Sequence, residues 1–571
     1  MSAENSESVD RPSGAVPTLC AAALAIALGV WWTRGMVLTR SLGWDESMHA
    51  DLPAVRMLLA LKRGEVHAAF DALLGCSQYP FVFPVVLAVV QGIFGIGEAV
   101  CRATGTVLWC TTLFGLFLLG RELAGDQRER SLAPWIGMAF GALSPMALAF
   151  AGTLFLEIPF ACASVFALRA WLRRGSRPGR GSEIAAGAWI AVAVFTKFNY
   201  GLLLGFGLAL DWVCEAVVAA RAGAFAAFAR RSAALVLVPA LSFAWWFLLP
   251  LPGGVDVGLE HRRALVAFLS GNQGWERVPY PRRLLDASAW LTLTPRLFVV
   301  LVLAALAAVR VVSRPGVRAL VLVFLSMAVP TLAHPFHLDR FLIPIAIPLW
   351  ALAGLGLART LPAHRVLRPA LLAALALLTI PFPARAAVRA AGLLGALSAD
   401  PRVRDYQEAQ CRLWSDLSPT RTLPTNGLEA RESDRILEIL AREAGPNEHV
   451  GWFGVSTNLA PAAIHLGLLA RGGSVERFLR DAAAPMDVAY FGDDPAWSDD
   501  ELAAFASRFD VVFSTEPQDI KGRPGRAWTR AYRDRLVQKL GWNARLVGSV
   551  AIERPLSDSL TVTVLACRPT R

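Results

Sequence analysis

Three carboxylates stand beside long apolar stretches of the sequence. Asp45 and Glu46 belong to the segment GWDESMH, and Glu157 belongs to FLEIP. A carboxylate in such a place can take a proton from a hydroxyl group, and it is costly to keep there without a function. The alternative is that each acid caps a helix or is solvated at an interface, and a single acid does not decide between the two. Two separate segments that each carry an acid favour a functional site.

Cations recur near the same stretches. Lys197 lies in FTKFNY, Arg102 follows the segment FVFPVVLAVVQGIFGIGEAVC, and HPFHLDRFLIP contains His337 and Arg340. Residues 251–292 form a loop with aromatic residues between its basic ones, which are Arg262, Arg263, Arg277, Arg282 and Arg283. Arginine forks match the oxygens of a phosphate group and stabilise negative charge that develops on it. The alternative is that these long side chains extend to water at the ends of apolar helices.

The composition places these residues in a membrane protein. Of the 571 residues, 55% are hydrophobic and 18% are charged, and the mean hydropathy is +0.46. A soluble protein of this length rarely has so apolar a composition. The net charge of +11 does not indicate a nucleic-acid partner, because the basic residues sit in short loops between apolar runs and form no single stripe. The cysteines include no CxxC pair, so they form no familiar metal-ligand pattern.

Apolar runs long enough to cross a bilayer fill the first two-thirds of the chain. Residues 1–14 are polar and slightly acidic, and we expect a disordered cytoplasmic tail there. The run from Ala15 to Trp32 lacks the basic start and the cleavage site of a signal peptide, so we interpret it as a retained helix. We predict about eleven spans, near residues 15–33, 103–120, 132–151, 159–172, 184–197, 200–219, 232–250, 293–310, 318–333, 341–358 and 369–385.

Arginine-rich loops indicate the orientation. With these spans, successive loops on one side carry most of the arginines, and by the positive-inside rule that side is cytoplasmic. The N-terminus is then inside, the C-terminal part is outside, and the three acids lie at the outer face of the inner membrane. The apolar segment Phe81–Ile96 would reverse this order if it crossed the bilayer. Because Pro80 and Pro84 open it, we expect an interfacial or re-entrant helix in the first outer loop.

The remainder of the chain, residues 386–571, is predicted to be an extracytoplasmic α/β domain, following a transmembrane domain over residues 15–385. Strand-like runs occur at 449–455, 487–492, 510–515 and 558–567, and helical patterns occur near 430–443, 457–470 and 498–508. No glycine-rich phosphate loop is present in it. Acceptor recognition and a purely structural cap are both open roles, and Cys411 and Cys567 either pair or remain separate thiols.

In the order of these segments the chain resembles the polyprenyl-phosphate-sugar glycosyltransferases of the glycosyltransferase-C superfamily, which includes protein O-mannosyltransferases and lipid A aminoarabinose transferases. The resemblance covers about residues 20–360. It rests on the acid pair, the apolar segment that precedes Arg102, the loop acid Glu157, Thr-Lys at 196–197 and Arg-Phe-x-x-Pro at 340–344. It implies a polytopic helical fold and an inverting transfer of a sugar from a polyprenyl-phosphate donor to an extracytoplasmic acceptor.

The resemblance also implies a role for each residue. Asp45 would be the base, and Glu46 would face elsewhere because adjacent helical residues point about 100° apart. Glu157 would orient the acceptor or help to hold a cation. The donor phosphate and substrate would be bound by Tyr79, Arg102, Lys197, Arg282, Arg283, His337 and Arg340. No cofactor is expected, although a divalent ion held by Asp45, His49 and Glu157 is an alternative without a tight spacing signature.

Two features depart from the relatives. The aminoarabinose transferases have a lysine before the first proline of the interfacial helix, and this chain has Tyr79 there, which puts the lipid A subtype in doubt. The C-terminal part lacks the repeated modules of the eukaryotic mannosyltransferases. The sequence therefore identifies neither the sugar nor the acceptor, which could be a lipid, a glycan or a protein.

Two other functions compete with transfer. A flippase or transporter of lipid-linked sugars should show inverted repeats and ionisable residues near the middle of the membrane, and the conspicuous acids here lie at loop ends instead. A non-catalytic assembly subunit would leave Asp45, Glu157 and Lys197 without a role.

Overall fold

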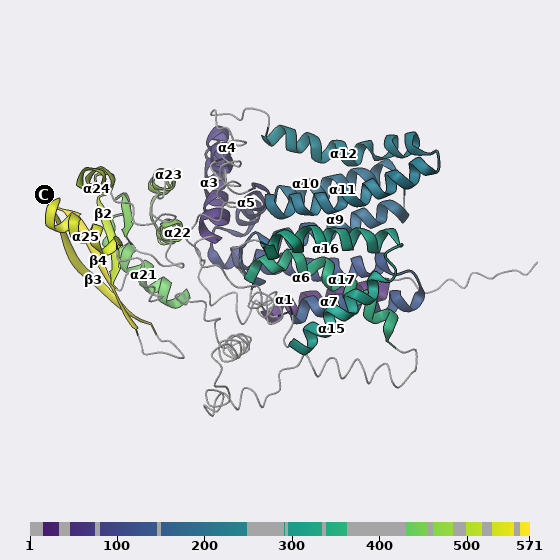
Figure 1. Cartoon of the computed structure of the whole chain (residues 1–571). Helices are drawn as coiled ribbons and strands as arrows, with labels where there is room; N and C mark the ends of the chain where they lie inside the picture. Colours follow the sequence, from purple (N-terminus) through teal and green to yellow (C-terminus); the bar gives the residue numbers. More distant parts are fainter. Residues whose placement is uncertain are drawn as a thin grey trace, which may run out of the picture.

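The computed structural model describes a helical bundle, a group of short helices across one end of it, and a small sheet domain (Figure 1). The described residues are 15–32, 46–74, 80–144, 150–176, 178–247, 291, 295–333, 339–361, 430–453, 461–483, 498–516, 528–552 and 560–570. Asp45, Tyr79, Arg282, Arg283 and His337 lie outside them, as do the predicted tail 1–14, the predicted span 369–385 and the predicted strand 487–492.

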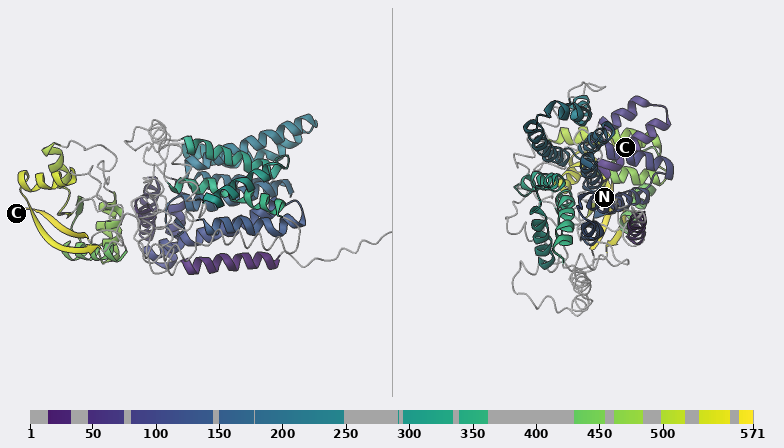
Figure 2. Two further views of the ribbon diagram at one scale, coloured as in Figure 1. Left: turned by 60° about the horizontal axis from the view of Figure 1, so that its bottom comes forward. Right: turned by 90° about the vertical axis from the view of Figure 1, so that its right-hand side faces the viewer.

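Ten helices form the bundle within these residues, one at each of the first ten predicted spans. They are α1 (Ala15–Trp32), α6 (Glu98–Leu123), α7 (Gln127–Leu143), α9 (Glu157–Ser176), α10 (Arg180–Val194), α11 (Phe198–Arg221), α12 (Phe225–Phe247), α15 (Pro295–Val309), α16 (Pro315–Ala333) and α17 (Leu342–Thr360). Figure 2 shows them running side by side, with α1 at the edge of the bundle. Five of them, α6, α11, α12, α16 and α17, are long and apolar enough to cross a membrane. The helical membrane part is thus confirmed, while the count of eleven spans stays a prediction.

Helix α17 is the centre of the bundle core. Nearly all of its residues are buried, and Trp350 is fully enclosed. Gly356 allows this density, because a β-carbon there would overlap the carbonyl oxygen of Ala304 on α15. Small residues are the usual way for membrane helices to bring their backbones together.

Four short helices lie across the end of the bundle that faces the sheet domain, which we call the domain-side end (Figure 1). They are η2 (Ser47–Asp51), α3 (Leu52–Lys62), α4 (Val66–Leu74) and α5 (Val82–Phe94). Helix α5 occupies the segment expected to be interfacial. One of its faces buries Phe83, Leu87 and Gln91, and the other exposes Val89 and Ile93. This two-sided helix has the amphipathic character expected of an interfacial segment.

The C-terminal part folds around a four-stranded sheet. Its strands β1 (Val450–Phe453), β2 (Val511–Glu516), β3 (Trp542–Ile552) and β4 (Leu560–Pro569) lie in the order β1-β2-β4-β3. The β1–β2 pair is parallel and the other two pairs are antiparallel. Residues alternate between the faces, as strand geometry requires. Val511 and Phe513 pack toward α21 (Ala430–Glu443) and α22 (Pro461–Ala470), and Val512 packs toward α24 (Asp499–Ala506) and α25 (Trp528–Lys539).

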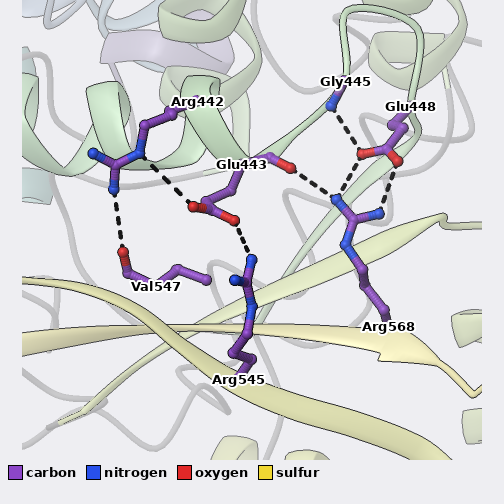
Figure 3. Close-up of polar contacts among 7 residues, drawn as sticks. All are labelled: Arg442, Glu443, Gly445, Glu448, Arg545, Val547 and Arg568. Carbon is purple, nitrogen blue, oxygen red and sulfur yellow. Dashed lines mark hydrogen bonds and ion pairs between the residues drawn. The ribbon is translucent and has the colours of Figure 1, made fainter.

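Ion pairs attach the β3–β4 hairpin to the end of α21 (Figure 3). Arg568 on β4 binds both carboxylate oxygens of Glu448, at 2.7 and 2.9 Å, and its Nη2 also donates to the carbonyl of Glu443. Arg545 on β3 donates to the Glu443 side chain at 2.5 Å. Such bidentate arginine contacts fix geometry better than single ones.

The sheet domain contacts the short helices through an apolar interface. Leu52, Val55 and Leu59 of α3 pack against α22 and α23 (Val475–Ala483), where the buried partners are Ala462 and Phe478. Figure 1 shows α22 and α23 between the sheet and α3. The domain therefore rests on the helix that follows the acid-bearing segment.

Candidate active site

Glu157, Lys197 and Arg340 meet at the domain-side end of the bundle. The Nζ of Lys197 donates to Oε1 of Glu157 at 2.5 Å, and Nε of Arg340 lies 3.4 Å from the same oxygen. Glu157 is buried, with 1% of its side chain exposed, against 10% for Lys197 and 20% for Arg340. We call these three residues the cationic centre, because two positive charges and one negative charge leave it with a net charge of +1.

Each member is positioned by the end of a different helix. Glu157 is the first residue of α9, where a carboxylate is favoured by the helix dipole. Lys197 is the N-cap of α11, in the tight turn from α10, which needs Gly201 because a β-carbon there would overlap the backbone of Val194. Arg340 lies in the 3₁₀ turn η3 (Asp339–Phe341) that leads into α17. Three helix ends thus converge on one point.

Aromatic rings surround the two cations. The guanidinium of Arg340 lies 4.3 Å from the centre of the Phe155 ring, and Nζ of Lys197 lies 5.4 Å from the centre of the Phe341 ring. The Tyr200 hydroxyl donates to the carbonyl of Phe341 at 3.1 Å and ties α11 to η3. Ring faces attract cations, so these contacts favour keeping both charges close to Glu157.

The Glu157 carboxylate is used on one side only. Both cations contact Oε1, and Oε2 accepts no hydrogen bond from the residues that the structure describes. An ionised carboxylate can accept about four hydrogen bonds. The centre therefore has acceptor capacity left for a ligand hydroxyl.

Glu46 and Arg102 form a second buried pair nearby. Nη1 of Arg102 donates to Oε1 of Glu46 at 2.6 Å, and both side chains are 1% exposed. The same Glu46 oxygen accepts the backbone N–H of Leu154 at 2.9 Å, and Arg102 also donates to the carbonyl of Gly152. Glu46 therefore fixes the start of η2 to the loop that leads into Glu157. Arg102, predicted to bind the donor, contacts this loop through the carbonyl of Gly152.

Asp51 is a buried acid that sequence reasoning missed. It precedes Leu52-Pro53 at the start of α3, where an aspartate is typical of a helix cap. Its side chain makes no capping hydrogen bond. Instead Oδ1 accepts Nε2 of Gln91 at 2.9 Å and the thiol of Cys101 at 3.2 Å. Burial raises the pKa of the Asp51 carboxyl, partly offset by these two hydrogen bonds.

No group of three or more His, Cys, Asp or Glu side chains suited to a metal ion occurs among the described residues. The metal alternative that involved Asp45 and His49 falls on side chains outside that set. Likewise, Cys567 is a buried free thiol, and Cys411 lies outside the described part of the chain.

The fold of the whole chain is similar to that of ArnT from Cupriavidus metallidurans. The apo structure of ArnT has 15% sequence identity and a TM-score of 0.56, and the match covers 97% of this chain and 98% of ArnT. ArnT bound to undecaprenyl phosphate has 16% identity and a TM-score of 0.54 over the same shares of the two chains. No protein-family model and no curated protein sequence matches the chain. The chain therefore has the fold of ArnT, and the similarity includes the C-terminal part.

Proposed function

We propose that this protein transfers a sugar, with inversion, from a polyprenyl-phosphate donor to an acceptor outside the cytoplasm. The observation that carries the proposal is the cationic centre of Glu157, Lys197 and Arg340 at the domain-side end of the bundle. The fold that contains it is shared with ArnT, which has been seen bound to undecaprenyl phosphate. A lipid phosphate would have its headgroup at this end and its tail along the apolar helices.

The charge of the centre suits the leaving group. A polyprenyl-phosphate sugar carries one negative charge on its phosphodiester, and the polyprenyl phosphate released from it carries up to two. Charge therefore develops on the phosphate as the bond to the anomeric carbon breaks. Lys197 and Arg340 are already held in place, so they stabilise that charge without reorganising. The phosphate is a good leaving group, and no general acid is needed.

Asp45 supplies the base in this proposal. One carboxylate is needed to take the acceptor's hydroxyl proton while the oxygen attacks the anomeric carbon. Glu46, the next residue, is bound to Arg102 and Leu154. Consecutive Cα atoms are about 3.8 Å apart, so the fixed position of Glu46 limits where the Asp45 carboxylate can act.

The proposal places the domain-side end outside the cytoplasm. The opposite end of the bundle, which we call the far end, carries many arginines, including Arg173, Arg230, Arg314 and Arg359. This asymmetry supports a cytoplasmic far end. Donor and acceptor would then meet at the outer face of the inner membrane.

The test is release of polyprenyl phosphate by the purified full-length chain in nanodiscs. The substrates are a synthetic polyprenyl-phosphate sugar and an acceptor-containing envelope extract. We expect Lys197→Gln and Arg340→Gln to lower turnover by about 30–1000-fold, equivalent to about 2–4 kcal/mol of transition-state stabilisation. Arg359→Gln at the far end, which also loses an arginine paired with a buried glutamate, is the control and should stay within about threefold.

Three results would count against the proposal. Movement of intact donor across the bilayer of proteoliposomes, without release of polyprenyl phosphate, would indicate a flippase. Retention of the anomeric configuration would exclude a single inverting step. If both variants turned over like the wild type, the cationic centre would not bind the phosphate, and Arg282 and Arg283 would be the next candidates.

A further inference from the structure

Asp51 stands at the junction of three elements. It is the last residue of the π-helical turn η2, and its partners Gln91 and Cys101 belong to α5 and α6. Asp51 is 4% exposed and Gln91 is 1% exposed. Turns of this kind are uncommon and often occur at functional sites. The Asp51–Gln91 hydrogen bond therefore joins the acid-bearing turn to the interfacial helix.

Helix α5 carries that connection to Lys197. At its other end, the N–H of Val82 donates to the carbonyl of Phe195 at 3.1 Å, and the Phe81 and Phe195 rings lie 5.3 Å apart. Phe195 is two residues before Lys197 in the turn between α10 and α11. A single rigid helix thus contacts η2 at one end and the backbone of the Lys197 turn at the other.

A second connection joins the same two places by another route. Glu46, the N-cap of η2, binds the N–H of Leu154, and the segment continues from there to Glu157, which binds Lys197. The two routes leave opposite ends of η2 and close a ring through the cationic centre. One route is held by the Glu46–Arg102 pair, and the other by the Asp51–Gln91 pair.

We propose that Asp51 and Gln91 are a positioning pair that sets the placement of η2, and so of the adjoining acid pair, relative to the cationic centre. The inference rests on the proposed function and adds two residues to it. Neither residue touches the phosphate-binding groups Lys197 and Arg340 in the structure described. Loss of the pair should therefore misplace the base and leave the phosphate site intact. A displacement of about 1 Å can cost about 100-fold in rate.

The test separates turnover from donor-site binding in the full-length protein. Gln91→Leu removes the donor of the hydrogen bond, and Gln91→Glu places two buried carboxyl groups together. We expect each to lower kcat by about 10–100-fold, with the Kd for undecaprenyl phosphate changed less than about threefold. The double variant Asp51→Asn/Gln91→Glu restores a donor and an acceptor in reversed order and should recover most of kcat. Val89→Ala, on the exposed face of α5, is the matched control.

Hydrogen exchange provides a readout that does not depend on activity. In Gln91→Leu the amides of residues 47–52 should exchange faster, and those of 198–204 at the start of α11 should be unchanged. Unchanged exchange at residues 47–52 would overturn the proposal, as would kcat within threefold of wild type, a parallel loss of phosphate binding, or no rescue by the double variant. A wild-type protein that releases no polyprenyl phosphate would instead overturn the proposed function.

Discussion

Glu129 and Asp211 at the far end of the bundle are bound differently from Glu157 at the domain-side end. At the far end Glu129 accepts Arg359 on Oε1, and Arg314 and the N–H of Gly125 on Oε2, at 2.6–2.8 Å. Asp211 likewise accepts Arg318 on one oxygen and the Trp171 indole on the other. At the domain-side end Glu157 uses only Oε1. Glu129 and Asp211 are thus satisfied on both oxygens, and Glu157 is not. Glu183, also buried at the far end, forms ion pairs with Arg174 at 3.8 Å and Arg231 at 3.5 Å, but neither of its oxygens accepts a hydrogen bond from the described residues.

The difference between Glu129 and Glu157 is one of remaining capacity to accept a hydrogen bond from a ligand. A buried carboxylate bound on both oxygens by neighbouring helices fixes those helices, and nothing remains for a ligand. A buried carboxylate that holds two cations through one oxygen leaves the centre positively charged and able to accept a further hydrogen bond. Burial and charge alone do not make the distinction, because Glu129 and Glu157 are each 1% exposed.

The proposed roles of the two ends require that the domain-side end lies outside the cytoplasm and the far end lies inside. Ser498 in the sheet domain and Ser176 at the far end are both exposed. In a cysteine-free background, Ser498→Cys should react with an impermeant maleimide added to intact cells, and Ser176→Cys should react only after permeabilisation. The opposite pattern would contradict both the orientation and the extracytoplasmic reaction.

Asp45→Asn should give the largest loss of rate. The substitution preserves size and removes the proton acceptor, so turnover should fall by about 10²–10⁴-fold. Binding of undecaprenyl phosphate, measured in nanodiscs, should persist because the cationic centre is unchanged. Transfer at a near-native rate would show that another group is the base.

Glu157→Gln tests the role of the Glu157 carboxylate, of which only Oε1 is bound by the two cations. Without the carboxylate, Lys197 and Arg340 lose the group that holds them together, and we expect turnover per folded molecule to fall by about 100-fold. Folded protein is quantified by size-exclusion chromatography before each assay. A proportional loss of folded protein and of activity, with unchanged turnover per folded molecule, would make Glu157 a structural acid like Glu129.

The sequence predicted the members of the cationic centre but not their contacts. Glu157, Lys197 and Arg340 were each recognisable as charged residues at the ends of apolar runs. Their convergence depends on how α9, α11 and α17 pack, and the Glu157–Lys197 contact spans 40 positions in the chain. Asp51 was not predicted, because the order Asp-Leu-Pro is typical of a helix cap. Only the folded structure shows that its side chain accepts a hydrogen bond from Gln91 instead.

The sheet domain shows the same limit. Strands β1, β2 and β4 were predicted because their buried runs are apolar. Strand β3 was missed because its sequence lacks a buried apolar run: Asn543, Ala544 and Arg545 are exposed, and the register shifts between Leu546 and Gly548. Such a strand is defined by its pairing with β4 more than by its own pattern.

Glu129→Gln is the far-end counterpart. It breaks an ionic cluster that joins α7 to the start of α16 and the end of α17. Breaking a fully buried ion pair costs about 3–5 kcal/mol. The free energy of unfolding should fall by less than this, because Arg314 and Arg359 are partly exposed. Turnover of the folded fraction should stay within about twofold. Thermal unfolding in detergent and the nanodisc assay together measure both. A selective loss of turnover would mean that the far end also takes part in the reaction.

The smallest effect is expected from pH, and it concerns the sheet domain that rests on α3. His465 on α22 is buried, and burial, with help from the nearby charge of Arg477, lowers its pKa from 6.5 to about 4. The unfolded domain therefore binds a proton at a higher pH than the folded one. The contribution of His465 to the free energy of unfolding is fully present above pH 6.5 and falls as the pH drops from 6.5 toward 4. The total loss is about 3 kcal/mol.

Amide exchange of α21 and α22 in the full-length protein measures that loss between pH 7 and pH 5, after correction for the intrinsic pH dependence of exchange. By pH 5 the free energy of opening should have dropped by about 2 kcal/mol, and His465→Gln should remove this pH dependence. Hydrogen bonds to Arg535 and Lys539 lower the pKa of Asp499. Its contribution to stability is therefore lost only below the ordinary pKa of 3.8 and does not change between pH 7 and pH 5.

Because α22 and α23 contact α3, the same opening should expose α3 amides, whereas the far-end cluster around Glu129 should be unaffected. Equal pH sensitivity at both ends would show that the domain and the bundle unfold as one unit, and the contrast between the two ends would then be one of chemistry and not of stability.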